Sequence, residues 1–435
     1  MRVLISGGGT GGHVYPALAV AAQLPKAVAE RCLIESNPKA EREFRKFADA
    51  ASAQHGSTPV AHKSVNGPGP IELLWAGSTN GMEQTLVERA GIAFHGIDTG
   101  KVRGVNLRIG VASIGKIVVG VRQSLALLRQ FQPDVCFVTG GYVCTPVVIA
   151  CRLRRIPVLI YLPDMMPGWA IRTLSHLAQR VAVSFPEVAG YFGGEVGKTS
   201  GRGKAVVTGY PVREALVSAA GGGKLDAVAH GQNRARVRRQ LADQLQRPLA
   251  DADEQPLPLV LVWGGSQGSR NINQSTWQAL PQLLPAAHVL HVVGERDWSL
   301  MQSWQQTQPL SSALAAHYHP VKYLHDEMVL ALIAADLTVA RAGASSLGEF
   351  TVARLPGVLV PLLGVNQLQN AELLSKEGGA VIVPDAKLAE QLASTVLGLL
   401  HDQPKRLAME TALASLAQPA AALKIARELL QLQHA

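Results

Sequence analysis

A histidine follows a glycine-rich loop near the start of the chain, in the run GGGTGGH at residues 7–13. The loop comes directly after an apolar, strand-like run at residues 2–6, and a helical stretch follows it. Gly7, Gly9 and Gly12 match G-x-G-x-x-G, in which glycine permits a tight turn and a close approach of the backbone to a diphosphate. The sequence therefore predicts a nucleotide-binding loop with a histidine beside it.

A nicotinamide-dependent dehydrogenase is the first hypothesis that this loop supports. Glu35 closes the next apolar segment, close to the offset of about 20 residues expected for an acid that binds the ribose. This pattern alone does not distinguish a dinucleotide site from other nucleotide sites, so the other glycine loops are needed to decide.

Three further loops of the same kind follow strand-like runs. They are TGGYVCTP (139–146), WGGSQGSR (263–270) and ARAGASSLGE (340–349). Each places glycines and small residues where backbone N–H groups and a helix N-terminus can face a phosphate. Four such loops, spread over both halves of the chain, favour a cleft between two domains over a single dinucleotide site.

Strand-like apolar runs alternate with helical stretches along both halves of the chain. The runs are RVLIS, IELLWAG, DVCFVTGG, PVLIYLP and RVAVSFP in the first half, and PLVLVWGG, HVLHVVG, DLTVARAG and GVLVPLLG in the second. Runs that are buried on both faces and separated by helices indicate parallel sheets built from βα units. We therefore predict an α/β fold with two doubly wound, Rossmann-like domains.

The domain boundaries are expected where periodicity is weak. We predict an N-terminal domain over 1–215 with an insertion near 25–70, a linker region over 216–256, and a C-terminal domain over 257–417. A final helix within 418–435 is expected to pack back on the N-terminal domain, because one of its faces is strongly apolar.

The net charge, the cysteines and the length of the apolar runs indicate which partners and which surroundings to expect. The net charge is +9 and the isoelectric point about 9.5, which suits an acidic partner such as anionic lipid, nucleic acid or a phosphorylated ligand. The four cysteines form no C-x-x-C pair, so we expect reduced thiols without a metal or disulfide role. No apolar run reaches the roughly 18 residues of a membrane span, so we expect a protein of the cytosol that can lie on a membrane surface.

The loop motifs resemble those of the MurG family, the N-acetylglucosaminyltransferases that complete lipid II in bacterial peptidoglycan synthesis. They occur in the family's order: GGGTGGHVYPALAV, GGYV, TGYPVR, GGSQGSR, ARAGASSLGE and NQLQNA. The resemblance implies a GT-B fold, with two Rossmann-like domains facing across a cleft. It also implies inverting transfer of N-acetylglucosamine from UDP-N-acetylglucosamine to the lipid-linked acceptor lipid I, with no cofactor, no metal and no nucleic acid.

The resemblance also implies the site residues. Ser266 would contact the donor diphosphate, Glu349 would accept hydrogen bonds from the ribose hydroxyls, and Gln367 would contact the sugar. His325 falls where a uracil-contacting residue is expected, through a backbone contact. The donor-binding residues implied are Thr10, Gly11, Gly12, Arg213, Ser266, His325, Ala344, Ser345, Ser346, Leu347, Gly348, Glu349 and Gln367. The acceptor-side residues implied are Gly140, Gly141, Tyr142 and Asp164.

His13 is the candidate catalytic base. An inverting transfer needs a group that takes the proton of the acceptor hydroxyl, and stabilisation of the departing diphosphate, which Arg213 and helix N-termini can supply. The dipole at a helix N-terminus disfavours an imidazolium, so we expect a neutral ring that can accept a proton. The alternatives are a capping or buried histidine at this position, with Asp98 or Asp164 as the base.

One segment departs from the family pattern. Residues 161–168 read YLPDMMPG, where the family usually has H-E-Q-N followed by x-x-P-G. The departure leaves the donor residues intact but concerns the acceptor side. A GT-B transferase with another lipid-linked or soluble acceptor is therefore the alternative to lipid I, and a nucleotide-sugar-binding protein without catalysis is a third hypothesis.

Residues 101–130 interleave basic and apolar residues. Around 108–129 the pattern is that of an amphipathic helix, with cations at Arg108, Lys116, Arg122 and Arg129. Such a surface can lie on anionic lipid. The alternative is that this segment is an ordinary helix of the domain, with one face in the core and one solvated basic face.

Overall fold

The structure is a computed structural model of the whole chain. It describes residues 1–9, 11–36, 71–79, 81, 83–98, 107–193, 204–223, 225–249, 257–265, 268–364 and 366–433. The chain divides into two compact units. The first comprises Met1–Pro163, Pro167–Pro211 and Ala420–Ala435, and the second comprises Asp164–Met166 and Val212–Pro419.

The described residues of the first unit form a seven-stranded parallel sheet in the order β3-β2-β1-β4-β5-β6-β7. Its strands are β1 (Arg2–Gly7), β2 (Glu72–Ser78), β3 (Ala93–Ile97), β4 (Val135–Gly140), β5 (Val158–Leu162), β6 (Arg180–Val183) and β7 (Ala205–Val207). The strand order reverses between β1 and β4. In doubly wound sheets, ligands bind at the carboxyl ends of the strands at such a reversal.

Helices flank this sheet. They are α1 (Gly11–Ser36), α3 (Glu83–Arg89), α4 (Leu107–Phe131), α5 (Cys144–Leu153), α6 (Trp169–Ser175) and α17 (Ala421–Leu432), with a 3₁₀ helix at Pro186–Phe192. The amphipathic helix expected around 108–129 is confirmed as α4, which packs along α5. Gly120 allows this close approach, because a Cβ there would lie 3.1 Å from Pro146.

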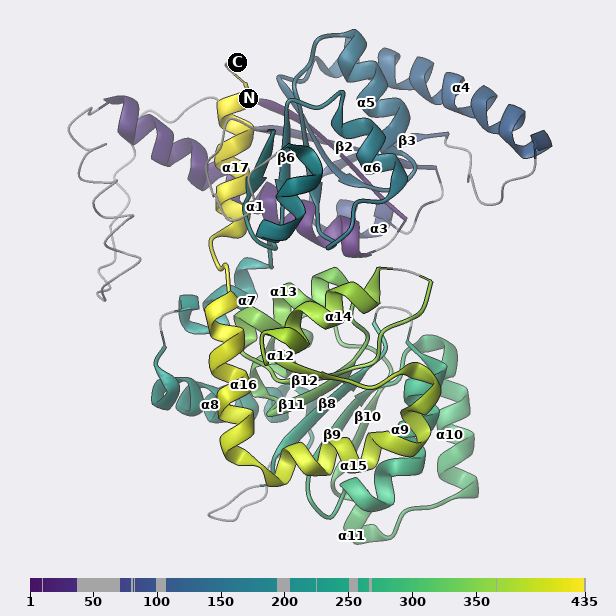
Figure 1. Cartoon of the computed structure of the whole chain (residues 1–435), viewed down its shortest axis with the longest axis vertical. Coiled ribbons are helices and arrows are strands. Elements are labelled where there is room, and N and C mark those ends of the chain that lie inside the picture. Colours follow the sequence, from purple (N-terminus) through teal and green to yellow (C-terminus); the bar gives the residue numbers. More distant parts are fainter. Residues whose placement is uncertain are drawn as a thin grey trace. The chain divides into compact units, whose positions relative to one another are not determined.

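Helix α1 is longer than its sequence indicated. We expected helix only to about Leu24, but α1 continues through Pro25 to Ser36, into the stretch predicted to be an insertion. Packing against α17 explains the difference: the two helices lie side by side in Figure 1, and Glu30 Oε2 accepts from Arg427 Nη2 at 2.8 Å. Such contacts offset the hydrogen bond that a proline removes from a helix interior. The rest of the predicted insertion, 37–70, lies outside the described residues.

The described residues of the second unit form a six-stranded parallel sheet in the order β10-β9-β8-β11-β12-β13. The strands are β8 (Leu259–Trp263), β9 (His288–Val292), β10 (Tyr318–Val321), β11 (Leu337–Ala340), β12 (Gly357–Leu359) and β13 (Ala380–Ile382). The helices are α7 (Glu214–Ala219), α8 (Ala227–Leu245), α9 (Arg270–Leu283), α10 (Trp298–Thr307), α11 (Ser312–Ala315), α12 (Glu327–Ala334), α13 (Ala344–Ala353), α14 (Gln367–Lys376), α15 (Leu388–His401) and α16 (Gln403–Leu416). Short 3₁₀ helices lie at Gly221–Gly223, Glu295–Asp297 and Asp385–Lys387.

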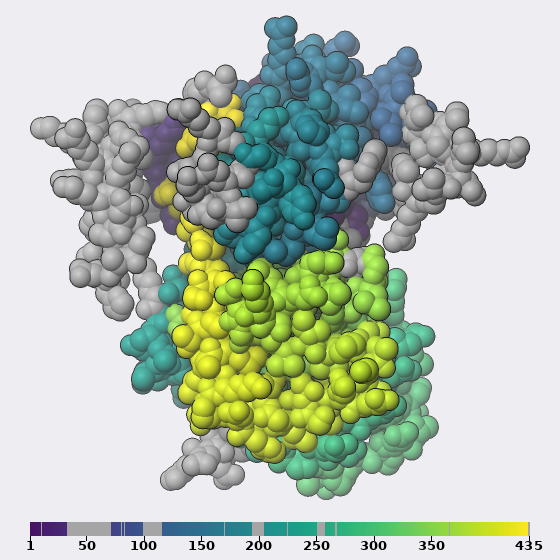
Figure 2. Space-filling model, viewed as in Figure 1, coloured from purple at the N-terminus to yellow at the C-terminus, as the bar shows by residue number. Residues whose placement is uncertain are grey.

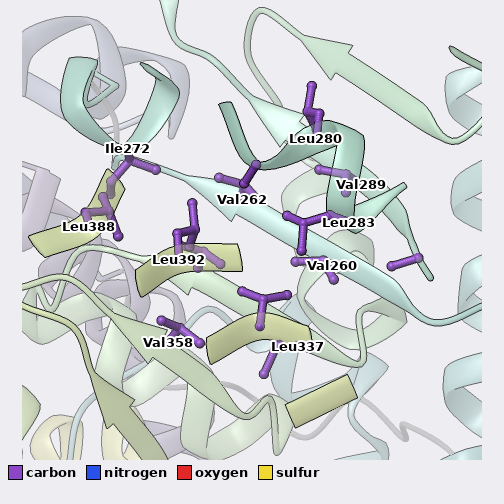
Figure 3. Packing of buried hydrophobic residues seen from close by; sticks show 14 of the residues in the cluster. Val260, Val262, Ile272, Leu280, Leu283, Val289, Leu337, Val358, Leu388 and Leu392 are labelled. Carbon is purple, nitrogen blue, oxygen red and sulfur yellow. The ribbon is translucent and has the colours of Figure 1, made fainter. Parts of the chain in front are cut away.

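Apolar side chains from the sheet and its helices form the core of the second unit. Strands β8, β9, β11 and β12 meet α9 and α15 there. In Figure 2 the C-terminal part of this unit, coloured yellow-green to yellow, faces the viewer. Figure 3 shows the packing of Val260, Val262, Ile272, Leu280, Leu283, Val289, Leu337, Val358, Leu388 and Leu392. This core holds the carboxyl ends of β8 and β11 in fixed positions, from which the candidate donor loops leave.

The described residues of the stretch 216–256, which we expected to be a linker region, belong to the second unit. Its basic run, RARVRRQL at residues 234–241, lies in α8. Arg234 Nη1 lies 3.2 Å from Asp336 Oδ1 and Arg234 Nη2 lies 2.7 Å from Glu410 Oε1. Arg238, which is buried, pairs with Asp336 as well. These arginines hold α8 on the unit and are not a free basic patch.

A buried histidine in the second unit couples its stability to pH. His291 is fully buried in β9, and Asn273 Oδ1 lies 3.0 Å from Nε2, which therefore carries the proton. Tyr318 Oη, 3.0 Å from Nδ1, then donates to the ring. Burial lowers the pKa of His291 from 6.5 to about 3, so the folded protein keeps this ring neutral well below the pH at which the unfolded chain protonates it.

We expect the second unit to lose stability as pH falls below about 6.5, because the unfolded state then binds a proton that folded His291 does not. The loss should be roughly 1.4 kcal/mol per pH unit for this group, until the folded pKa is approached. Urea unfolding at pH 7, 6 and 5, followed by tryptophan fluorescence, measures it. In the H291Q variant the free energy of unfolding should depend less steeply on pH than in wild type. In H401Q, which removes an exposed histidine, it should depend on pH as in wild type. Equal slopes in wild type and H291Q would contradict the assignment.

Candidate functional site

In the first unit, the loops after β1 and β4 lie against each other. Gly8 N donates to Gly140 O at 3.1 Å. A Cβ on Gly141 would lie 2.5 Å from Gly8 O, so only glycine permits this approach, and Gly141 also has a positive φ of 97°. Two glycine loops that were predicted separately are therefore one assembly at the reversal of strand order.

His13 lies in the first turn of α1, beside this assembly. Its Nδ1 is 3.0 Å from Gly8 O. Because a carbonyl oxygen can only accept, Nδ1 carries a proton, and in the neutral ring the lone pair is therefore on Nε2. The backbone of His13 is also held, since Thr139 Oγ1 donates to His13 O at 2.7 Å. The ring lies so close to Gly140 that a Cβ there would be 2.9 Å from its Nε2. The imidazole is thus oriented with Nε2 as the atom able to take a proton.

The neighbouring residues implied by the family resemblance are placed as follows. Gly11 and Gly12 form the start of α1, and a Cβ on Gly11 would lie 3.1 Å from the ring of Tyr15. Tyr142, in the loop after β4, has 53% of its surface exposed. Thr10 lies outside the described residues.

Asp98 is poorly suited to be the base. Its carboxylate accepts hydrogen bonds at 3.0 Å from Gln123 Nε2 and at 3.0 Å from Thr79 Oγ1. These hydrogen bonds, that from Gln123 foremost, lower the pKa of Asp98 below its ordinary value. A carboxylate stabilised in its ionised form is a weaker proton acceptor, so His13 is favoured over Asp98.

Asp164 lies in the second unit, whereas we expected it on the acceptor side. Its Oδ1 accepts from Asn370 Nδ2 at 3.2 Å, and Asn370 Oδ1 accepts from Met165 N at 3.2 Å. The amide of Asn370, which is buried in α14, therefore accounts for the placement of this segment. Asn370 was not among the predicted site residues, although it belongs to the motif NQLQNA.

Residues 344–349, which we expected to bind the donor, follow the carboxyl end of β11. Helix α13 begins there at Ala344, and its first turn includes Ser345 and Ser346, so its backbone N–H groups are available to a phosphate. Glu349, further along α13, has a side chain only 15% exposed. Burial raises the pKa of Glu349, and the nearby guanidinium of Arg213 opposes that rise.

Arg213 and Glu349 form an ion pair that the sequence did not reveal. Arg213 Nη2 lies 3.4 Å from Glu349 Oε1, although the two residues are 136 positions apart. Leu347 and Gly348, in the second turn of α13, are buried. The pair therefore keeps a carboxylate of α13 and the guanidinium that precedes α7 together.

Arg341 joins three loops of the second unit and was missed by sequence reasoning. It directly follows β11, and its Nη2 donates to Ser269 Oγ at 2.7 Å. Its Nη1 donates to Val360 O at 3.1 Å and pairs with Asp385. Its position as the one cation in the motif ARAGASSLGE was the available signal.

Gln367 and His325 each form hydrogen bonds with residues that are close to them in sequence. Gln367 begins α14, and its Oε1 accepts from Leu362 N at 2.9 Å, which leaves its Nε2 as the donor for a ligand. His325 is exposed, its N donates to Glu327 Oε2 at 3.0 Å, and its O accepts from Met328 at 3.4 Å. Uracil could therefore contact the backbone of His325 only by sharing its N–H or its carbonyl, both of which already form hydrogen bonds within the chain. Ser266 lies outside the described residues.

Models of two protein families match this chain. The glycosyltransferase family 28 C-terminal domain matches residues 259–425, and the glycosyltransferase family 28 N-terminal domain matches residues 3–54 and 68–183. Together they span more than half of the chain. The dehydrogenase hypothesis is therefore wrong, and the N-terminal glycine pattern belongs to a glycosyltransferase.

Relatives extend the similarity over nearly the whole chain. They are named UDP-N-acetylglucosamine–N-acetylmuramyl-(pentapeptide) pyrophosphoryl-undecaprenol N-acetylglucosamine transferase. The relative from Roseiflexus sp. is 34% identical, over 98% of this chain and 94% of its own. Those from Desulforudis audaxviator and Listeria monocytogenes are 32% and 30% identical, over 97% and 99% of this chain and 95% and 99% of their own.

Solved structures show the same fold. The structure of Acinetobacter baumannii MurG superposes with a TM-score of 0.65 at 23% identity, covering 99% of each chain. UDP-GlcNAc 2-epimerase from Neisseria meningitidis, bound to UDP-GlcNAc, superposes with a TM-score of 0.60 at 12% identity, covering 99% of this chain and 100% of the other. Together with the two parallel sheets, these similarities confirm the predicted GT-B fold class.

Proposed function

Since this chain belongs to glycosyltransferase family 28 and, within it, to the MurG family, we propose that it transfers N-acetylglucosamine from UDP-N-acetylglucosamine to N-acetylmuramyl-(pentapeptide) pyrophosphoryl-undecaprenol. The product would be lipid II. The observation that carries the proposal is similarity of 30–34% identity over nearly the full length of relatives that are named for this reaction.

In the proposed mechanism, His13 acts as the base. Its Nε2 takes the proton of the acceptor hydroxyl while that oxygen attacks the anomeric carbon of the donor sugar. The bond from that carbon to the diphosphate breaks, UDP leaves, and the configuration inverts. The hydrogen bond from Nδ1 to Gly8 O, at 3.0 Å, supports this role because it keeps the lone pair on Nε2.

The second unit would bind the donor. Glu349 would accept from the ribose hydroxyls, Gln367 Nε2 would donate to the sugar, and the first turn of α13 would face the diphosphate. Arg213 would then serve two groups, the Glu349 carboxylate and the leaving diphosphate. Negative charge that develops on UDP during the transfer would be stabilised by these fixed donors.

A different acceptor is the second candidate, and Tyr161 favours it. This residue stands where the family usually has histidine, but it is fully buried in β5 and its Oη lies 2.7 Å from Ser184 Oγ. Tyr161 therefore cannot supply the polar group that the family has at this position. An acceptor that does not need this group fits the same donor site.

Incubating the chain with labelled UDP-N-acetylglucosamine tests both candidates. Lipid I and a variant with a shortened lipid should become labelled at comparable initial rates if lipid I is the acceptor. Release of UDP without label in lipid I, but with label in another lipid-linked or soluble saccharide, would favour the second candidate. Binding of UDP-N-acetylglucosamine without any transfer would refute both.

We also propose that α4 contacts the cytoplasmic face of the membrane. Val118 and Val119 are 49% and 46% exposed, and the exposed cations Lys116 and Arg122 flank them. Arg129 is exposed further along the helix. The side chain of Arg108 lies outside those described. Basic and apolar side chains that share one exposed face suit anionic lipid. None of the described helices is long and apolar enough to cross a membrane.

Sedimentation with vesicles tests this surface. Wild type should bind vesicles that contain phosphatidylglycerol more strongly than vesicles of phosphatidylcholine alone, and added salt should weaken the binding. The K116E/R122E variant should bind less. The control R239E/K405E makes the same change of charge at exposed positions of α8 and α16. An equal loss of vesicle binding in both variants would indicate that the net charge of the protein, rather than α4, determines the binding.

A further inference from the structure

Glu83 is a buried carboxylate that sequence reasoning missed. It begins α3, and none of its surface is exposed. Glycines surround it: a Cβ on Gly8 would lie 2.4 Å from its Oε1, and a Cβ on Gly81 would lie 2.3 Å from the same oxygen. A side chain at position 8 would displace the Glu83 carboxylate, which occupies the volume where its Cβ would lie.

The hydrogen bonds that Glu83 forms with other described residues are all ones in which its oxygens accept. Oε1 accepts from Ser78 N at 2.9 Å and from Ser78 Oγ at 2.6 Å. Oε2 accepts from Gly9 N at 3.3 Å. An ionised carboxylate has this acceptor-only pattern. Glu83 therefore joins the loop after β2 to the glycine loop after β1.

The Gly9 N–H and the Gly8 carbonyl belong to one peptide group. The carbonyl oxygen of that group lies 3.0 Å from His13 Nδ1, as described above. A continuous path therefore runs from the Glu83 carboxylate, through the Gly8–Gly9 peptide, to the imidazole of His13. The path consists of two hydrogen bonds, at 3.3 Å and 3.0 Å, on opposite sides of a rigid, planar peptide.

We propose that Glu83 is a positioning residue that acts on His13 through the Gly8–Gly9 peptide. Hydrogen bonds in a chain polarise one another, so a carboxylate on the peptide N–H makes the peptide carbonyl a stronger acceptor. That carbonyl then holds the Nδ1–H tautomer and stabilises the imidazolium that forms when Nε2 takes a proton. In serine proteases an aspartate does this by direct contact with histidine.

This arrangement resolves a conflict in the local electrostatics. The N-terminal end of α1 disfavours a positive charge on His13, yet a base must become positively charged during the reaction. The Glu83 carboxylate, acting through the peptide, offsets that cost. The inference rests on the proposed role of His13 as the base.

Nuclear magnetic resonance of ¹⁵N-histidine-labelled protein tests the proposal without any acceptor. The His13 signals are assigned by their loss in H13Q. The E83Q variant removes the charge but keeps the shape of the side chain. We expect the His13 signals of E83Q to titrate at a pH lower by roughly half a unit and to show more of the Nε2–H tautomer. The matched control is E88Q, which makes the same change at an exposed position of α3 and should behave as wild type.

The transfer assay adds a second readout. The E83Q rate should fall by roughly tenfold, with the acidic limb of its pH profile at lower pH and the KM for UDP-N-acetylglucosamine unchanged. His13 signals in folded E83Q that match wild type would overturn the proposal. Absence of transfer by wild type would count against the proposed function alone, since the resonance experiment needs no acceptor.

A second variant covers the case in which E83Q does not fold. S78A removes the hydroxyl donor from Oε1, which leaves more negative charge on the carboxylate for the Gly9 N–H. The His13 signals should then titrate at higher pH than in wild type, the direction opposite to that expected for E83Q. A midpoint that is unchanged or lower in S78A would overturn the proposal.

Discussion

Replacing His13 with glutamine should lower the rate of sugar transfer by roughly 100- to 10,000-fold, the range that a general base contributes. Glutamine is similar in size, but its amide cannot take a proton from the acceptor hydroxyl. Because Glu349 and Gln367, which we propose bind the donor, belong to the second unit and His13 to the first, the affinity for UDP should change little. Initial rates with saturating donor, and calorimetric titration with UDP, measure the two effects separately.

The control for this variant is H95Q, which alters an exposed histidine of β3 in the same unit. It should transfer at the wild-type rate. A folded H13Q protein that keeps more than a tenth of the wild-type rate would show that another group takes the proton. Asp98 would then be the next residue to replace, despite its lowered pKa.

Replacing Glu349 with glutamine should weaken the binding of UDP and UDP-N-acetylglucosamine by about 10- to 100-fold, since a hydrogen bond to a charged group contributes about 1.5–3 kcal/mol. The substitution keeps the shape of the side chain but removes its charge. It also leaves the guanidinium of Arg213 without the carboxylate that lies 3.4 Å away. Calorimetric titration measures the affinity, and E372Q, at an exposed position of α14, is the matched control.

The raised pKa of Glu349 adds a dependence on pH. As pH falls toward that pKa, the carboxylate is protonated and loses its charge as an acceptor, so the UDP affinity of wild type should fall. In E349Q the same pH range should have little effect. Wild-type affinity that does not change with acidification, together with unchanged affinity in E349Q, would place the ribose elsewhere.

The sequence predicted the centres of both sheets and missed their edges. Nine apolar runs became β1, β2, β4, β5, β6, β8, β9, β11 and β12. The four strands without a predicted counterpart, β3, β7, β10 and β13, are the four edge strands of the two sheets. Central strands are buried on both faces and read as continuous apolar runs, but an edge strand such as β3, with three of its five residues exposed, does not.

The sequence predicted those site residues whose motif lies within one short stretch of the chain. His13 and the glycine loops follow strands directly, and the structure brings His13, Gly140 and Gly141 together. Contacts between residues far apart in sequence were not predictable. Glu83 and Gly9 are 74 positions apart, and no local pattern marks the glutamate as the partner of a glycine loop. Tertiary packing also extended α1 past Pro25, where local propensity predicts a helix end.

The division of the chain between the two units has a consequence for synthesis on the ribosome. Helix α17 packs against α1, so the first unit contains residues from both ends of the described chain. The second unit lies almost entirely within one continuous stretch, Val212–Pro419. The second unit therefore needs no residue that precedes Asp164, whereas the first unit cannot complete its packing until α17 has been synthesised. Until then the surface of α1 that α17 covers stays exposed, which favours aggregation of the first unit.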